Sequence, residues 1–348
     1  MIMFWGKYNF SKLIVLILFF GIRIYGSTEN SIDKSFYKKL TTIVDRYTRP
    51  ITVLGVMNSY EDYAFEIARN YNATCVVVEE DVNKKDRMIS KCLHEEKLDN
   101  VMLLSKKMSV EDLERLASCE HFDVVLIFNL NYQWQQECER TIKAVLNLGD
   151  NIILEVPPCS SCGRKLKNYL LDQKSDIIWK DFSSSGNQEK IVFWFKNHKE
   201  SLDRHHWFGK SGFSSDYIIT SNFHEKNIYK TKENKKNKWI PGINLLTFVM
   251  LDGAWPKKSF IRKSIEQLRD IDHEDFMMWN MIIQGFNIIP IDYTIASRNP
   301  LDKVLCVSFT LEMLEQHSSE QAIQWFKDNW AQFAKKQGRE IPLSFFDV

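Results

Sequence analysis

The stretch ITVLGVMNSYEDYAFEIARNYNATCVVVEED, residues 51–81, places two apolar, β-branched runs on either side of a segment with helical periodicity. Both runs are almost continuously apolar, and neither alternates with polar residues. Such runs are typical of strands that are buried on both faces, as in a parallel sheet covered by helices. The stretch therefore predicts a strand, a crossover helix and a second, parallel strand.

The same alternation continues on both sides of this stretch. A helical pattern precedes it from residue 34, and three further apolar runs, separated by helical patterns, extend to residue 158. We therefore predict an α/β fold with a doubly wound, mostly parallel Rossmann-like sheet over residues 34–197, with the run 191–197 completing the sheet. Beyond it, residues 198–348 predict an α+β extension that is polar and irregular to residue 240 and has a helix at residues 259–271.

The first 26 residues differ in kind from the rest. Lys7 and Lys12 precede the apolar run LIVLILFFGI, and the small residue Gly26 precedes Ser27, as at a cleavage site. Ten apolar residues are too few to span a bilayer, which needs about 20, so residues 1–26 favour a signal peptide or a short membrane leader. With a working leader, the protein is expected to be secreted, periplasmic or membrane-associated. If the leader does not function, the protein is cytoplasmic. The structural alternative is that these residues form a buried first helix.

The charge and the cysteine content of the chain limit which partners and which kind of scaffold we expect. The 46 basic and 45 acidic residues give a net charge of +1, so we expect no nucleic-acid partner. The expected acceptor is a small molecule or a glycan, and membrane contact is expected only through the leader. Seven cysteines in 348 residues do not make a disulfide-dense scaffold. Cys159 and Cys162 have C-x-x-C spacing but no second pair at zinc spacing, which favours loop cysteines or one local disulfide.

Residues 52–158 resemble the Rossmann-fold methyltransferases that use S-adenosylmethionine. In that family the loop after the first strand reads close to VLDxGxxxGxxS. In this chain Gly55 replaces the acid, and the two glycine positions fall on Met57 and Glu61. The resemblance implies a methyltransferase-like protein, and these departures predict weakened or lost binding of the cofactor, because glycines let the backbone approach it closely.

The resemblance also implies a set of cofactor-binding residues. Gly55 and Asn58 lie in the first loop, Glu79 or Glu80 matches the acid that holds the ribose hydroxyls, and Asn129 leaves the fourth strand. The structural alternatives are solvated acids at a strand end for Glu79 and Glu80, and a strand-to-loop cap for Asn129.

A second polar pattern lies in HEDFMMWNMIIQGFNIIPIDY, residues 273–293. Its H-x-D-x-x-x-x-N spacing resembles the catalytic loop of kinases related to aminoglycoside phosphotransferases. That resemblance implies Asp275 as the catalytic base, with Asn280 and Asp292 as catalytic ligands of magnesium bound to ATP. In the structural alternative, Asp275 caps a helix end, Asp292 caps a strand end, and QGFN is a hairpin turn.

Three functions are therefore compatible with the sequence. The first is an S-adenosylmethionine-dependent methyltransferase-like protein. The second is a magnesium–nucleotide phosphotransferase that acts through the C-terminal half. The third is an exported, non-catalytic pseudoenzyme that binds a partner or a glycan.

Overall fold

A computed structural model of the chain describes most of the first half and several separate segments of the second. The described residues are 34–56, 61–71, 73–94, 98–128, 137–156, 165, 176–185, 188–196, 217–221, 226–230, 240–268, 278, 281–290, 300–315, 321, 324–325 and 328–329. The predicted leader lies outside them. Within the described part of the chain, no helix has the length and apolarity needed to cross a membrane.

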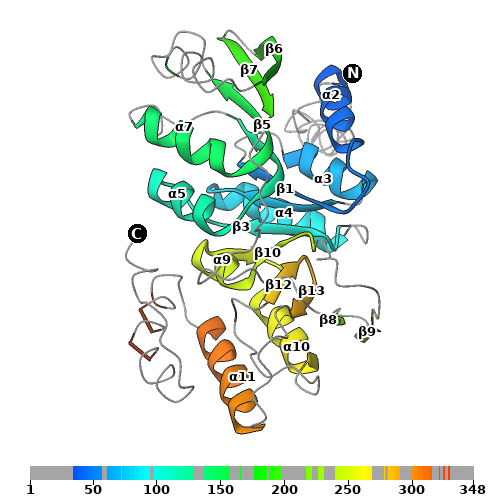
Figure 1. The fold of residues 1–348 in the computed structure, drawn as a ribbon, viewed down its shortest axis with the longest axis vertical. Helices are drawn as coiled ribbons and strands as arrows, with labels where there is room; N and C mark the ends of the chain where they lie inside the picture. The colour runs from blue at the N-terminus through cyan, green and yellow to red at the C-terminus, as the bar shows by residue number, and fades with distance from the viewer. Residues whose placement is uncertain are drawn as a thin grey trace, which may run out of the picture.

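Five parallel strands form the middle of an eight-stranded sheet, in the order β11-β3-β2-β1-β4-β5-β7-β6 (Figure 1). They are β1 (Ile51–Val56), β2 (Ala73–Val78), β3 (Val101–Leu104), β4 (Phe122–Ile127) and β5 (Gly149–Val156). β1 pairs in parallel with both β2 and β4, so the chain winds outward from β1 in two directions. The predicted doubly wound α/β sheet is confirmed.

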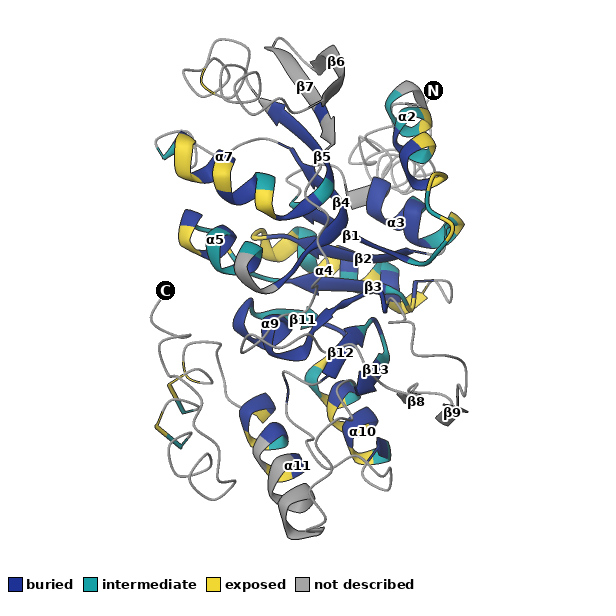
Figure 2. Cartoon of the chain, viewed as in Figure 1, coloured by how far each residue is buried: buried dark blue, intermediate teal, exposed yellow. Residues whose placement is uncertain are grey.

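Helices cover both faces of this sheet. On one face α2 (Lys34–Val44), α3 (Glu61–Asn70) and α4 (Val82–His94) pack over alternate strand residues, including Val53 and Val77. The opposite face is covered by α5 (Val110–Cys119), α7 (Cys138–Asn147) and α9 (Leu245–Met250). In Figure 2, β1 to β5 are buried over most of their described length, while exposed residues lie on the outer sides of the helices. Burial on both faces explains why these strands read as continuous apolar runs.

A β-hairpin extends the sheet beyond β5. β7 (Gln188–Lys196) pairs antiparallel with β5, and β6 (Asp176–Ser185) pairs antiparallel with β7. The apolar run 191–197 was expected to complete the sheet and does so as β7. β6 was not expected, because its sequence DIIWKDFSSS is only partly apolar.

The second half of the chain forms a five-stranded sheet in the order β10-β12-β13-β8-β9. Its strands are β8 (Tyr217–Ser221), β9 (Lys226–Lys230), β10 (Ile243–Asn244), β12 (Met281–Gln284) and β13 (Asn287–Pro290). The same half contains the helices α10 (Lys258–Leu268) and α11 (Pro300–Glu315). Residues 198–240 were expected to be polar and largely irregular, with room for a reduced hairpin, and the hairpin of β8 and β9 lies there. α10 confirms the helix expected at residues 259–271, within a residue at its start.

The extension also adds a strand to the first sheet. β11 (Gly253–Trp255) pairs antiparallel with β3 and forms the edge of the eight-stranded sheet. One continuous apolar core includes Leu54 and Met102 of the first half together with Phe248, Ile265 and Ile283 of the second. The described parts of the two halves therefore share a core.

Candidate functional site

The carboxyl ends of the parallel strands meet at one edge of the sheet. Val56 lies opposite Val78 on one side and Ile127 on the other, and Val78 lies opposite Leu104. Strand order reverses at β1, between β2 and β4. In open α/β sheets, ligands bind outside the carboxyl ends of the strands at such a reversal, so this edge is the candidate site.

Glu79, the first residue after β2, is fixed at this edge and only 2% exposed. Its backbone N–H donates to the Leu104 carbonyl oxygen at 3.0 Å, and its Oε1 accepts a hydrogen bond from the Asp81 N–H at 2.9 Å. Asp81 in turn caps α4, because its Oδ1 accepts from the N–H groups of Asn83 and Lys84. Glu80 is exposed. Of the two candidate acids, Glu79 is the one whose carboxylate is buried and oriented at the site.

Ser105 follows β3 at the same edge. Lys85, in the first turn of α4, donates from Nζ to the Ser105 Oγ at 3.1 Å. The Ser105 N–H donates to the Asp252 carbonyl oxygen at 2.9 Å. Neither Ser105 nor Asp252 was expected at the site, and no local sequence signal identifies them, because their proximity depends on the pairing of β11 with β3.

Aromatic side chains pack at the end of β4. The Phe128 N–H donates to the Val56 carbonyl oxygen at 3.3 Å, which extends the pairing of β4 with β1. The Phe128 ring stacks on Tyr63 with centroids 6.3 Å apart, and Phe36 meets both rings edge-on. These three rings form an aromatic cluster beside the end of β4.

Several residues expected at a site lie outside the described residues. Gly55 is buried in β1, between Val77 of β2 and Leu126 of β4, whereas Asn58 and Asn129 are not described. The expected phosphotransfer residues Asp275, Asn280 and Asp292 are not described either. Among the described residues, no group of three or more His, Cys, Asp or Glu side chains could hold a metal ion. The roles assigned to all these residues stay predictions.

The strand-turn-strand around QGFN is present as β12 and β13. Gln284 lies opposite Asn287, and Gly285 and Phe286 form a two-residue turn in which Gly285 has a φ of +57°. A positive φ at the first central residue is typical of tight hairpin turns. Both the kinase-like interpretation and the simple hairpin predict this element, so its presence favours neither.

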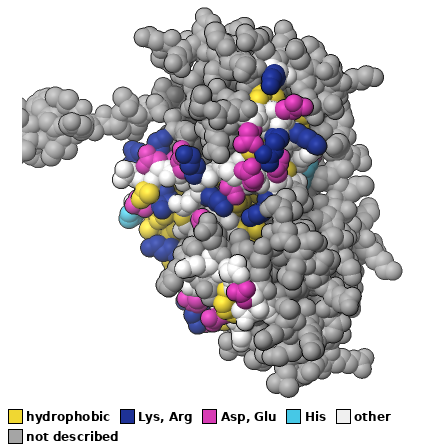
Figure 3. All heavy atoms as spheres, turned by 90° about the vertical axis from the view of Figure 1, so that its left-hand side faces the viewer, with side chains coloured by type: hydrophobic (Ala, Val, Ile, Leu, Met, Phe, Trp, Pro, Cys, Tyr) yellow, Lys and Arg dark blue, Asp and Glu magenta, His cyan; other side chains and the backbone are white. Residues whose placement is uncertain are grey.

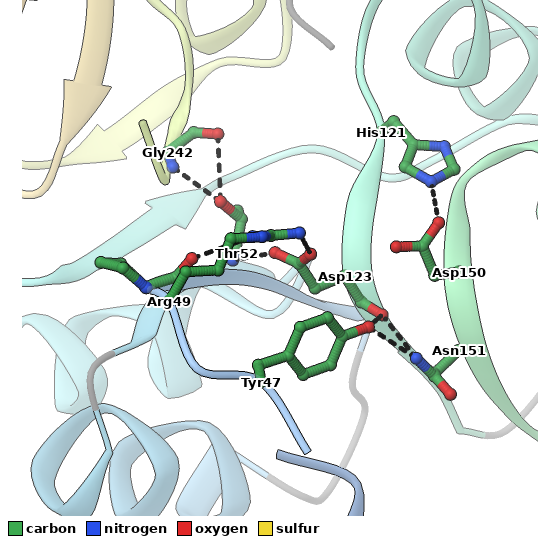
Figure 4. A network of polar contacts seen from close by, with 9 residues as sticks. Tyr47, Arg49, Thr52, His121, Asp123, Asp150, Asn151 and Gly242 are labelled. Atoms are coloured by element: carbon green, nitrogen blue, oxygen red, sulfur yellow. Dashed lines mark hydrogen bonds and ion pairs between the residues drawn. The ribbon is translucent and has the colours of Figure 1, made fainter. Parts of the chain in front are cut away.

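A buried polar network occupies the opposite, amino end of the strands (Figure 4). The Asp123 carboxylate is fully buried; it accepts from Arg49 Nη2 at 2.6 Å and from the Thr52 N–H at 2.7 Å. Tyr47 donates to the Asp123 carbonyl oxygen at 2.9 Å, and Asn151 Nδ2 donates to the Tyr47 hydroxyl at 2.6 Å. This network ties β1, β4 and β5 together at the edge away from the candidate site.

The extension is bound to the same amino end. The Thr52 hydroxyl accepts a hydrogen bond from the Gly242 N–H at 2.7 Å. Glu120, 3% exposed, accepts at Oε1 from the Asn244 N–H at 2.8 Å and from the Thr247 hydroxyl at 2.6 Å. These contacts hold the segment that leads into α9 against the parallel sheet.

Charges of both signs mix on the surface over α5 and α7 (Figure 3). Arg140 of α7 forms ion pairs with Glu111 and Glu114 of α5 and with the adjacent Glu137. Hydrogen bonding to Glu114 and the surrounding carboxylates raise the Arg140 pKa, while hydrogen bonds from its own backbone N–H and from Ser109 lower the Glu111 pKa. Mixed signs on this face fit the near-neutral net charge.

No protein-family model and no curated protein matches the sequence. Solved structures that resemble part of the chain include several methyltransferases. TrmK of M. capricolum, in complex with S-adenosylhomocysteine, is 10% identical with a TM-score of 0.36, over 48% of this chain and 72% of that one. Magnesium protoporphyrin IX methyltransferase from Synechocystis, with its cofactor bound, is 14% identical with a TM-score of 0.38, over 56% of this chain and 100% of that one.

The precorrin-6y C5,15-methyltransferase of Geobacter metallireducens is similar to about the same extent. It is 12% identical with a TM-score of 0.37, over 49% of this chain and 91% of that one.

Proposed function

We propose that this protein is an S-adenosylmethionine-dependent methyltransferase-like protein that holds the nucleoside of its cofactor at the carboxyl ends of β1, β2 and β3. The observation that carries the proposal is Glu79, a buried and oriented carboxylate directly after β2 and 24 residues after Gly55. In doubly wound nucleotide-binding folds, an acid about 20 residues after the first loop accepts hydrogen bonds from the ribose hydroxyls.

The described residues fit the nucleoside end of this cofactor. The Glu79 carboxylate is an acceptor for hydroxyl donors, and the Asp81 N–H orients it, so little order has to be gained on binding. When bound, S-adenosylmethionine supplies a methyl group on a positively charged sulfur. Phe36, Tyr63 and Phe128 give the end of β4 an apolar surface beside this site.

Affinity for the amino-acid end of the cofactor is expected to be reduced. Met57 and Glu61 stand at the two positions where the resembling family has glycines, and side chains there prevent close backbone approach. The acceptor in this proposal is a small molecule or a glycan.

Glu79→Gln is expected to weaken binding of S-adenosylhomocysteine by about 10- to 100-fold, because hydrogen bonds to a charged acceptor contribute about 1.5–3 kcal/mol. Isothermal titration calorimetry of the full chain measures this directly. The matched control is Glu80→Gln, which changes the exposed neighbour and should leave the affinity unchanged. If Glu79→Gln and Glu80→Gln lost affinity for S-adenosylhomocysteine equally, the proposed role of Glu79 in binding the ribose would be wrong.

Thermal shift separates the three functions, because a ligand that binds the native state raises Tm. Stabilisation by S-adenosylmethionine at near-millimolar concentration supports the methyltransferase-like protein. Stabilisation by ATP with magnesium that is lost in Asp292→Ala and kept in Glu79→Gln supports the phosphotransferase instead. No shift with either ligand contradicts both enzymes and leaves the non-catalytic binding protein.

We also propose that residues 1–26 direct the chain into an oxidising compartment. Cys138, the first residue of α7, is disulfide-bonded, which supports this proposal because disulfides persist mainly outside the reducing cytosol. N-terminal sequencing of the natural protein and peptide mapping without reductant test it: a start at Ser27 and an oxidised Cys138 are expected. Residues 1–26 retained together with a reduced Cys138 would contradict it.

A further inference from the structure

Cys138, the first residue of α7, is disulfide-bonded and only 2% exposed. Cys75 and Cys92 are buried and free, so neither of them is its partner. Because the Cα atoms of bonded cysteines lie less than about 7 Å apart, the backbone positions of the other cysteines limit which of them can bond to Cys138. Within the chain, the possible partners are Cys119, Cys159, Cys162 and Cys306.

Cys119 lies at the end of α5 that points away from the start of α7. α5 leads into β4 and α7 leads into β5, and these strands are parallel, so the two helices run in the same direction. Arg140 of α7 pairs with Glu111 and Glu114 in the first half of α5, which places the N-terminal ends of both helices side by side. Since a helix rises 1.5 Å per residue, Cys119 is roughly 10–15 Å from Cys138. That distance is too long for a disulfide.

Cys306 lies in α11, a helix of the extension that is distant from α7. α11 packs against α10, and Glu315 of α11 pairs with Arg262 of α10. In Figure 1, α5 and α9 lie between α7 and α11. The axes of packed helices are about 8–10 Å apart, so the distance between α7 and α11 exceeds what a disulfide can span.

Cys159 and Cys162 follow β5 after only a few residues. Both lie outside the described residues, so their positions are limited by the length of chain from Val156, the last residue of β5. α7 packs on β5 and runs antiparallel to it, so Cys138 lies toward the carboxyl end of β5. Packed layers are about 10 Å apart. Three residues of extended chain span about 10 Å and six span about 20 Å, so both cysteines of the pair can reach Cys138.

We propose that Cys138 is bonded to a cysteine of the C-x-x-C pair, Cys159 or Cys162, so that a disulfide anchors the loop after β5 to α7 at the carboxyl edge of the sheet. In forming the bond, the two thiols lose two protons and give two electrons to a disulfide donor of an oxidising compartment, whose own disulfide is reduced to two thiols. The inference is independent of cofactor binding. It rests on an oxidised Cys138, as the proposed export does.

Peptide mapping of the natural protein without reductant identifies the partner of Cys138. After alkylation of the free thiols and digestion with trypsin, residues 116–140 are expected to be linked to residues 144–164, which contain the C-x-x-C pair. Further cleavage after Glu120 separates Cys119 from Cys138 and should leave the link on the Cys138 fragment. A link from Cys138 to Cys119, or to residues 304–327 around Cys306, would overturn the inference.

Thermal unfolding with and without dithiothreitol is a second test. The bond closes a loop of roughly 20–25 residues, so the reductant is expected to lower the wild-type Tm by about 5 °C. Cys138→Ser should lose most of this sensitivity, and so should a variant with both Cys159→Ser and Cys162→Ser.

The matched control is Cys92→Ser, which changes a buried free cysteine and should keep the sensitivity to dithiothreitol. If the variant with both pair cysteines replaced keeps the full sensitivity while Cys138→Ser loses it, Cys138 is bonded elsewhere and only this inference is wrong. A reduced Cys138 in the natural protein contradicts both this inference and the proposed export. Failure to bind S-adenosylhomocysteine contradicts the methyltransferase-like function alone.

Discussion

Gly285→Ala is expected to destabilise the protein by about 2–5 kcal/mol, because a left-handed conformation and a steric clash act together. Gly285 has a φ of +57°, and a Cβ added there would lie 1.6 Å from the Asp99 carbonyl oxygen. The same oxygen accepts a hydrogen bond from the Phe286 N–H at 3.1 Å. The turn between β12 and β13 therefore cannot carry a side chain and keep its contact with the turn before β3. Thermal unfolding should show a decrease in Tm on the order of 10 °C.

A second substitution separates the two causes. Asparagine tolerates positive φ better than alanine, so Gly285→Asn would recover much of the stability if backbone conformation were the main cost. Because the clash is with backbone atoms of Asp99, we expect Gly285→Asn to be as unstable as the alanine variant. Gln284→Ala, in the same hairpin, is the near-neutral control. Wild-type stability in Gly285→Ala would contradict the described contact.

Glu120→Ala is expected to loosen the attachment of the extension at the amino end of the sheet. The variant leaves the Asn244 N–H and the Thr247 hydroxyl, both buried, without the acceptor that holds them. Losing the acceptor of a buried donor costs about 1–3 kcal/mol, so a loss of about 2–6 kcal/mol is expected for the two donors. Thermal unfolding measures the loss, and limited proteolysis should show faster cleavage between residues 197 and 240.

Glu120→Gln is the matched control for this prediction. Its amide oxygen can still accept both hydrogen bonds, so it should recover most of the stability, with about 1 kcal/mol lost with the charge. If the glutamine variant were as unstable as the alanine variant, the charge of Glu120 would matter more than its two hydrogen bonds to the extension.

The strands of the first half could be predicted because their environment is uniform. β1, β2 and β4 are buried on both faces over nearly their whole length, so an apolar run is the only local signal they need. Parts of the extension lack such a signal. β11 is the three-residue segment GAW, and its role as an edge strand depends on β3, far away in the sequence. Periodicity within a short window cannot reveal that pairing.

The candidate site was predictable only in part, for a related reason. The sequence places Glu79 and Glu80 together at the end of a strand, and only burial distinguishes the oriented carboxylate from the solvated one. Ser105 and Asp252 become neighbours through β11. Cys138 was not expected to be disulfide-bonded, because a cysteine at the start of an ordinary helix has no spacing motif.

The hydrogen bond between Thr52 and Gly242 joins residues 190 positions apart, and this separation affects how the chain folds during synthesis. When the parallel strands have left the ribosome, β3 still has an open edge and the face beside Leu54 is not yet covered by α9. Contacts between distant residues form slowly, and open strand edges invite pairing with other chains. We therefore expect the first half to expose this strand edge and this apolar face to other chains until the extension has been synthesised.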